Sequence, residues 1–175
     1  MNVSGAIVIP ANGSGKATLD LIGELDFPVV FGVRHLGFGT FDYVGPNYFL
    51  GMQIATQHLL DLGHRTIAFV GGEDENSAYA ERIGGFRMAI SSNTNANLKT
   101  FEIQGPPTSQ FGVQVFEQLQ ELDPKPTAII AYNDLLAFGL VSGAGQHGLR
   151  PGQDISIVGF DDVRASALRN IPLTT

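Results

Sequence analysis

Short apolar runs alternate along this chain with longer stretches in which apolar residues recur every three or four positions. The short runs predict buried strands, and the longer stretches predict amphipathic helices. The predicted strands cover residues 6–10, 27–33, 67–70, 98–103, 128–131 and 155–158, and the predicted helices cover 17–25, 48–62, 78–91, 109–122 and 134–147. Because strands that alternate with helices form parallel βαβ units, the pattern predicts an α/β fold of parallel, Rossmann-like sheets flanked by helices.

The pattern divides the chain unevenly at Gly45-Pro46, which breaks a short extended pair, Tyr43-Val44. Asn47 is a suitable N-cap for the next helix, in which four apolar residues are spaced to lie near one face: Leu50, Ile54, Leu59 and Leu62. Four strands and four helices follow Gly45, but only two clear strands and one helix precede it. Two strands make a poor sheet, so we expect residues 1–45 to be a truncated first lobe and the rest a nearly complete second lobe. The missing strands would come from outside these 175 residues or from another copy of the chain.

Polar residues follow the predicted strands at the edge where an open parallel sheet binds ligands. Asn133 and Asp161 each come directly after a strand, and Arg82 lies in the first turns of the helix that follows residues 67–70. Asn133 and Asp161 could instead be helix N-caps, and Arg82 could form a structural ion pair with Glu81 or bind a C-terminal carbonyl. Together the three residues form a donor and acceptor set that suits the hydroxyl groups of a sugar.

Composition narrows the function classes. The net charge of −7 argues against this piece gripping nucleic acid by itself, since a phosphate-binding surface needs clustered Lys and Arg. The absence of Cys excludes disulfides and thiolate metal sites and fits a cytosolic protein. No apolar run approaches the ~18 residues of a membrane span, and residues 1–4 lack the positive charge of a secretion signal.

Other motifs favour ordinary structural roles. Residues 12–16 lie where a phosphate-binding loop would lie, but Pro10 and Ala17 replace the Gly and the Ser or Thr that such a loop requires. The acidic run at 73–75 lacks the spacing of a calcium loop, and the six-residue separation of two histidines is not a zinc spacing: His58 and His64. Asp161-Asp162 has no evident partner for hydrolysis. We therefore expect no cofactor, no metal site, no catalytic residue and no enzymatic activity.

Several stretches, in order along nearly the whole chain, form a specific combination. They are LLDLGHRTIAF at 59–69 with Gly71-Gly72, AERIGGF at 80–86, residues 126–134, GLRP at 148–151, DISIVGFDD at 154–162 and PLTT at 172–175. This combination resembles the lac/galactose repressor family of bacterial transcription regulators.

The resemblance implies a two-lobed effector-binding core similar to periplasmic sugar-binding proteins, together with a helix-turn-helix module that reads operator DNA as a dimer. By this comparison, residues 1–45 are a fragment of the first lobe, 46–170 form the effector-binding second lobe, and 171–175 begin the crossover back. The hinge would include residues 44–46. The helix-turn-helix, the first strands and the final return segment would lie outside the chain.

The resemblance also implies residue roles. Arg82, Asn133 and Asp161 match effector-contacting positions, and Leu135 and Phe138 match a surface used for dimerisation. The sequence departs from the family at Gly32-Val33-Arg34, where a common Val-Asp-Arg would supply an acidic ligand, and also at two prolines: Pro46, in place of a frequent Asp, and Pro107, in place of an occasional aromatic residue. With Arg34 and Arg82 near the site and that carboxylate absent, we hypothesise an acidic or phosphorylated sugar as the effector.

These observations predict part of a cytoplasmic, ligand-responsive transcription regulator that binds a sugar or sugar derivative and forms a homodimer. It would reach operator DNA only through the missing module and would not bind a membrane. The alternative is a periplasmic sugar-binding protein of a transport system, and an enzyme of the same α/β class comes third.

Overall fold

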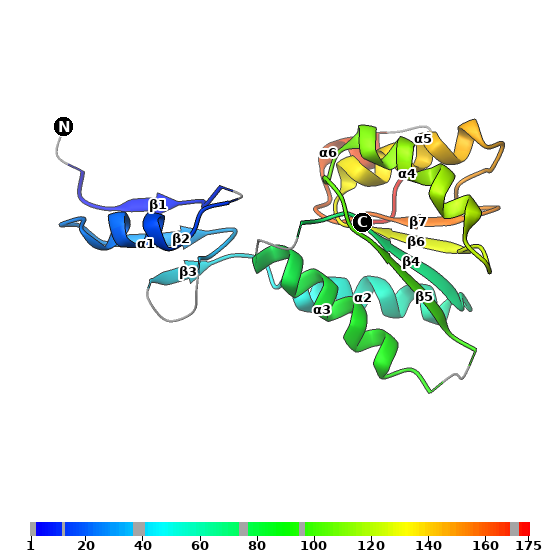
Figure 1. Cartoon of the computed structure of the whole chain (residues 1–175), viewed down its shortest axis with the longest axis horizontal. Helices are drawn as coiled ribbons and strands as arrows, with labels where there is room; N and C mark the ends of the chain where they lie inside the picture. The colour runs from blue at the N-terminus through cyan, green and yellow to red at the C-terminus, as the bar shows by residue number, and fades with distance from the viewer. Residues whose placement is uncertain (1–2, 12, 37–40, 74–76, 95–96, 169–171) are drawn as a thin grey trace.

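The computed structural model describes residues 3–11, 13–36, 41–73, 77–94, 97–168 and 172–175. It forms two lobes that the chain joins between β3 and α2 (Figure 1). Asn12 of the loop tested for phosphate binding, and Asp74 and Glu75 of the acidic run, lie outside the described residues.

The first lobe is a parallel sheet in the order β1-β2-β3 with one helix. Its elements are β1 (Ala6–Val8), α1 (Lys16–Gly23), β2 (Val29–Gly32) and β3 (Asp42–Val44). Ile22 of α1 packs with Val29 and Phe31 of β2 to form its small core. The sequence pattern gave only two clear strands here. The extended pair that includes Tyr43 is in fact part of a third strand, which pairs with β2 and is too short to show a periodic pattern.

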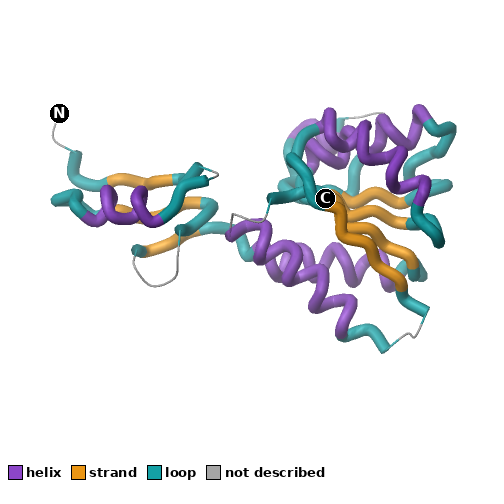
Figure 2. Tube along the Cα trace, in the orientation of Figure 1, coloured by secondary structure: helices purple, strands orange, loops and turns teal. Residues whose placement is uncertain are grey.

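The second lobe is a four-stranded parallel sheet in the order β5-β4-β6-β7. Figures 1 and 2 show helices on both of its faces, α2 and α3 on one and α4 and α5 on the other. The elements are α2 (Tyr48–Asp61), β4 (Thr66–Val70), α3 (Ser77–Ser91), β5 (Lys99–Ile103), α4 (Ser109–Glu121), β6 (Ala128–Ala131), α5 (Asp134–Gln146), β7 (Ser156–Val158) and α6 (Arg164–Ala167). The predicted α/β fold of parallel sheets with flanking helices is confirmed.

The two central strands of this sheet are buried from both sides. Every residue of β6 is buried, as is β4 from Ile67 to Val70. Burial on both faces is the reason that these strands read as continuous apolar runs without alternation. No helix within the described residues is long and apolar enough to cross a membrane.

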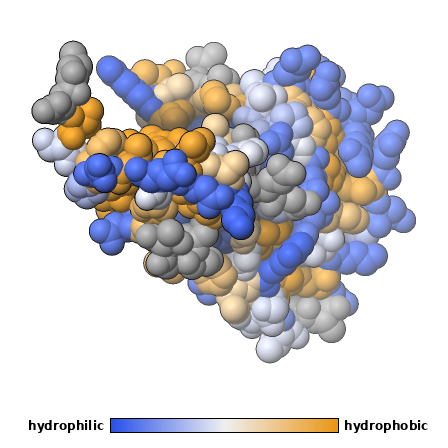
Figure 3. Space-filling view, turned by 60° about the vertical axis from the view of Figure 1, so that its left-hand side comes forward, coloured by the Kyte–Doolittle hydropathy of each residue, from blue (hydrophilic) through white to orange (hydrophobic). Residues whose placement is uncertain are grey.

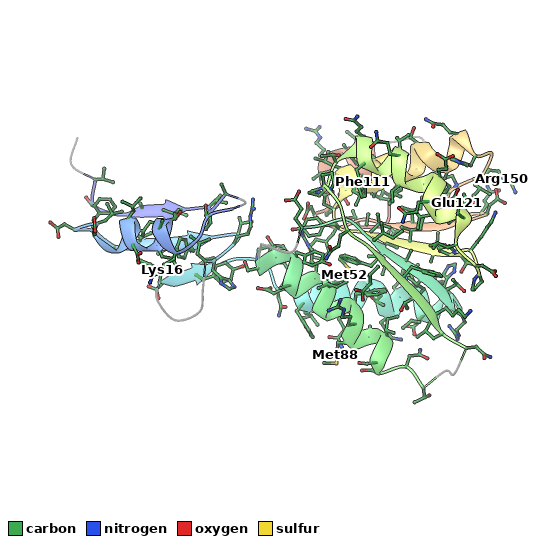
Figure 4. All side chains as sticks on the ribbon, viewed as in Figure 1. Lys16, Met52, Met88, Phe111, Glu121 and Arg150 are labelled. Carbon is green, nitrogen blue, oxygen red and sulfur yellow. The ribbon has the colours of Figure 1, made fainter. Side chains whose placement is uncertain are left out.

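The buried face of α2 differs from the predicted one. Of the four apolar residues expected near one face, only Leu59 is buried; the other three are 47–62% exposed: Leu50, Ile54 and Leu62. The helix instead buries Tyr48, Met52, Thr56, Leu59 and Leu60. The hydroxyl of Thr56 can be buried because it donates to the Met52 carbonyl at 2.7 Å, a bond that the sequence pattern does not reveal. Figure 4 shows Met52 on the sheet side of the helical layer and Met88 on its outer side.

Exposed apolar side chains also occur on the first lobe. Ile7 is 80% exposed and Val44 is 72% exposed. Apolar surface is visible where this lobe comes forward in Figure 3. Among the described residues of this lobe, the core contains three buried apolar side chains, and other apolar side chains lie at the surface.

Glycines allow α4 and α5 to lie unusually close together. A Cβ at Gly139 would collide with the carbonyl oxygen of Ser109, and a Cβ at Gly143 would lie 2.7 Å from the Cβ of Phe116. Backbone in contact with backbone cannot move aside as a flexible side chain can. The packing of this helical layer thus depends on the absence of side chains at these positions.

Gly139→Ala should therefore lower the free energy of unfolding by about 1–3 kcal/mol, the usual cost of overpacking. Gly145→Ala in the same helix is the matched control because its Cβ would meet no atom within 4 Å. The control should be neutral or stabilising by up to about 1 kcal/mol, through helix propensity. Urea unfolding of both variants measures the difference; equal stabilities would contradict the proposed close contact.

Candidate functional site

The guanidinium group of Arg82 lies among three aromatic rings at the carboxyl edge of the second-lobe sheet. Its central carbon is 4.4 Å from the ring centre of Tyr48, 4.2 Å from that of Tyr132 and 4.4 Å from that of Phe160. These residues come from the start of α2 and from the segments after β6 and β7. The electron-rich faces of the rings stabilise the cation that α3 places between them.

Asp161 supplies the opposite charge. Arg82 Nη2 donates to Asp161 Oδ1 at 2.9 Å, and the Arg82 side chain is only 5% exposed while that of Asp161 is 40% exposed. The structural ion pair considered for Arg82 exists, but its partner is Asp161 and not Glu81. Arg82 Nε is buried and has no hydrogen-bond acceptor among the described residues. One donor of a buried cation thus stays available to a ligand.

The backbone after β7 is bent to bring the carboxylate back to Arg82. Asp161 has a φ of 112° and Asp162 a φ of 47°, both in the region that residues other than glycine rarely adopt. Burial is the largest influence on the Asp161 carboxyl and raises its pKa; Arg82 opposes this effect, and Asp134 adds to it. The carboxylate of Asp161 is therefore held at a free-energy cost that a ligand donating to it would reduce.

Asn133 is the N-cap of α5, as the structural alternative predicted. Its Oδ1 accepts the backbone N–H of Leu136 at 2.9 Å, and its Nδ2 donates to the carbonyl of Pro107 at 3.4 Å. The cap fixes the direction of the side chain while the residue also lines the cavity beside Arg82. Asp161, by contrast, is not a cap, because α6 begins after Val163.

Asp134 is a structural residue that the sequence analysis missed. It is buried, and its Oδ2 accepts from the Val163 backbone N–H at 2.9 Å and from the Ser166 hydroxyl at 2.7 Å. Its own N–H donates to the Phe160 carbonyl at 2.9 Å. Asp134 therefore anchors the segment that carries Phe160 and Asp161. Only its position beside Asn133 signals this role in the sequence, since its partners lie about thirty residues away.

A cavity of about 230 Å³ brings the predicted ligand-binding residues together across the two lobes. The second lobe contributes Arg82, Asn133 and Asp161, and the first lobe contributes Val33 and Arg34. Its remaining lining residues are Tyr48, Gly72, Glu73, Ala78, Pro107 and Tyr132. A larger hollow of about 620 Å³ adjoins it and shares Tyr48 and Asp161, but Arg82 and Asn133 do not line it. The smaller cavity is thus the one with converging polar groups.

Arg34 reaches this cavity from a strained turn. Val33 has a φ of 64°, and the Arg34 N–H donates to the Gly32 carbonyl at 2.6 Å, which closes a γ-turn around Val33. The Val33 N–H donates to the Val44 carbonyl at 3.0 Å and so keeps the turn attached to the neighbouring strand. Positive φ at a β-branched residue is rare and often accompanies function. Arg34 therefore lies where the sequence predicted a first-lobe ligand contact, whereas Val33 was notable in the sequence only as a departure from the family's common Asp.

The other predicted site residues are placed apart from this cavity. Leu135 is 55% exposed on α5, whereas Phe138 is 6% exposed and packs within the lobe. A dimer contact through both residues stays a prediction, and of the two only Leu135 offers a largely exposed side chain for it.

His64, one of the two histidines whose spacing did not fit a zinc site, contacts the hydroxyls of Thr127 and Ser156, each at 2.9 Å. No group of three potential metal ligands occurs among the described residues.

Asp161→Asn should remove one pH-dependent contribution to stability. The folded Asp161 carboxyl has a raised pKa, so the folded chain binds more protons than the unfolded chain between the two pKa values. Its contribution to the free energy of unfolding consequently falls as the pH rises through that window. Urea unfolding at several pH values from about 4 to about 7 measures the slope.

Asp162→Asn removes the exposed carboxylate next along the chain and is the matched control for the loss of one negative charge at this turn. Identical slopes in the Asp161→Asn variant and the unmodified chain would show that Asp161 does not titrate as inferred.

Comparison with known proteins identifies the family to which this chain belongs. A family model described as a periplasmic binding protein-like domain matches residues 56–175. The HTH-type transcriptional repressor PurR of Histophilus somni (strain 129Pt) is 34% identical over 134 residues, which cover 77% of this chain. The chain spans only 40% of that repressor's length.

Solved structures of similar fold match nearly the whole of this chain. The structure of a LacI transcriptional regulator from a Rhodococcus species has a TM-score of 0.87 at 27% identity, with 99% of this chain and 63% of that one covered. A LacI family transcriptional regulator from Enterococcus faecium, with bound ribose, has a TM-score of 0.85 at 29% identity, with 98% of this chain and 63% of that one covered. The chain therefore belongs to the periplasmic binding protein-like domains of the lac/galactose repressor family.

Proposed function

We propose that this chain is part of the effector-binding core of a cytoplasmic transcription regulator. The effector, a sugar or sugar derivative, would bind in the cavity around Arg82. The observation that carries this proposal is the buried guanidinium held beside Asp161 and Asn133, whose Nε finds no acceptor among the residues that the structure describes. Its relatives named as transcriptional repressors favour a regulator over a transport protein or an enzyme, and one structural neighbour holds ribose.

Each polar group has a distinct task in this proposal. Arg82 Nε donates to an effector oxygen, the exposed part of Asp161 accepts from a hydroxyl, and Asn133 adds an amide at the carboxyl end of the neighbouring strand. Arg34 donates from the first lobe. Side chains from both lobes line the same cavity. An effector that contacts both lobes would therefore favour the arrangement in which the lobes are closed.

Closure is the proposed signal. Residues 1–45 would belong to the first lobe, 46–170 to the second and 171–175 to the start of the crossover back. In a homodimer that uses the α5 surface around Leu135, a change in lobe spacing would move helix-turn-helix modules attached to the first lobes relative to operator DNA. Such coupling requires the effector to bind one arrangement better, typically by about 1–3 kcal/mol.

The chemistry of the cavity bears on the effector's charge. Two guanidinium groups line it together with the carboxylates of Glu73 and Asp161, and Asp161 is already paired with Arg82. We propose that Arg34 selects an acidic or phosphorylated sugar. Calorimetry with neutral and phosphorylated forms of the same sugar tests this proposal, and tighter binding of a neutral hexose would overturn it.

Arg82→Ala should weaken effector binding by about 10- to 100-fold, the loss expected when a hydrogen bond to a charged group is removed. A thermal-shift screen of sugars and sugar phosphates, including ribose, identifies the effector first, since binding to the folded state raises apparent stability. Arg82→Lys keeps a charge beside Asp161 but lacks Nε, so it should bind as weakly while folding better than the alanine variant.

Arg87→Ala is the matched control. Arg87 lies on the same helix but pairs with Glu102 at the surface, where its side chain is 62% exposed. Its removal should change stability by about 0–1 kcal/mol and leave binding intact. Unaltered affinity in both Arg82 variants would exclude Arg82 as an effector contact.

A further inference from the structure

A second contact joins the lobes beside the cavity. The backbone N–H of His35, in the loop after β2, donates to the Ser77 hydroxyl at 3.3 Å. His35 Nε2 lies 3.6 Å from Glu81 Oε1, with the two side chains 8% and 28% exposed. Ser77 and Glu81 are one turn apart at the start of α3 and therefore lie on the same face of the helix. One loop of the first lobe thus rests on one helix of the second.

We propose that His35, Ser77 and Glu81 form a latch that favours the closed arrangement of the lobes, more strongly when His35 is protonated. The effect of the latch on effector binding rests on the proposed function, because the closed arrangement is the one proposed to hold the effector. The latch itself rests only on the contacts between the lobes.

The position of the latch couples it to the cavity. His35 follows Arg34 directly, and Glu81 precedes Arg82 directly, so adjacent residues on both lobes serve the latch and the cavity. The strained turn at Val33 sets the path of both Arg34 and His35. Opening the latch would therefore draw Arg34 away from Arg82 and separate the two halves of the ligand site.

The surroundings of His35 favour control by its charge. Tyr43 of β3 packs edge-on against His35 with ring centres 5.1 Å apart, and its hydroxyl donates to the Val33 carbonyl at 3.1 Å. Burial, followed by Glu81, raises the pKa of Tyr43, so this phenol stays neutral. Arg34 precedes His35 on the same loop, and Arg82 follows Glu81 on α3, where it is paired with Asp161.

Protonation would strengthen the contact. A neutral imidazole 3.6 Å from a carboxylate gains little, whereas an imidazolium adds a charge–charge attraction in a partly buried place. Histidine gains its charge between about pH 8 and about pH 5. Lower pH should accordingly shift the lobes toward the closed arrangement without any effector.

Spin labels can measure this shift directly, because the chain contains no cysteine. The exposed residues Asp20 on α1 and Gln118 on α4 can be replaced by cysteine, labelled and used to record the distance between the lobes. From about pH 8 to about pH 5.5, the closed-to-open ratio should rise about two- to fivefold, as for a partly exposed ion pair. His35→Gln and Glu81→Gln should each abolish the rise.

His58→Gln, which replaces an exposed histidine of α2, is the control and should keep the response. A distance distribution that is the same at both pH values, or a response that survives in both latch variants, would overturn the proposal. Because no effector is present, a failure of the latch is distinguishable from a failure of effector binding, which Arg82→Ala tests separately.

Discussion

The burial of one guanidinium group organises this protein. Arg82 is nearly inaccessible to water, and a cation in such a place requires compensation. Three aromatic rings and one carboxylate provide it, from α2, the segment after β6 and the segment after β7. The cation thus holds together elements that are far apart in sequence. The compensation is incomplete, since Nε has no acceptor in the described part of the chain, and that donor makes the site suitable for a ligand.

The supporting contacts keep this arrangement in place. Asp134 anchors the segment that carries Phe160 and Asp161, and Asn133 starts α5 beside the cavity. Close helix packing at Gly139 fixes α5 against α4. On the other lobe, a strained turn at Val33 presents Arg34. A rigid second lobe therefore meets a short loop of the first, which is the geometry in which small contacts between lobes can control closure.

The fold was largely predictable because β4 and β6, the central strands of the second lobe, are buried on both faces and because α2 to α5 are long helices. The predicted span 128–131 coincides with β6, and the other predicted strands and helices overlap the observed ones. The predictions from sequence were wrong or incomplete where a pattern of apolar residues allowed more than one structure. The apolar residues of α2 gave one possible face, but packing on α3 and the internal bond of Thr56 selected another. β3 is three residues long, too short for a periodic pattern, and only its pairing with β2 identifies it as a strand.

The sequence by itself determined the α/β class, the family and the identities of Arg82, Asn133 and Asp161, because local periodicity and motif order are properties of the chain alone. Only the tertiary structure decided the role of each. It paired Arg82 with Asp161 across 79 positions, assigned Asn133 to a cap and gave Asp134 its anchoring role. It also brought His35 to Glu81. The partner of a buried charge depends on which segments pack together in the fold. The spacing of residues along the chain does not reveal which distant segments these are.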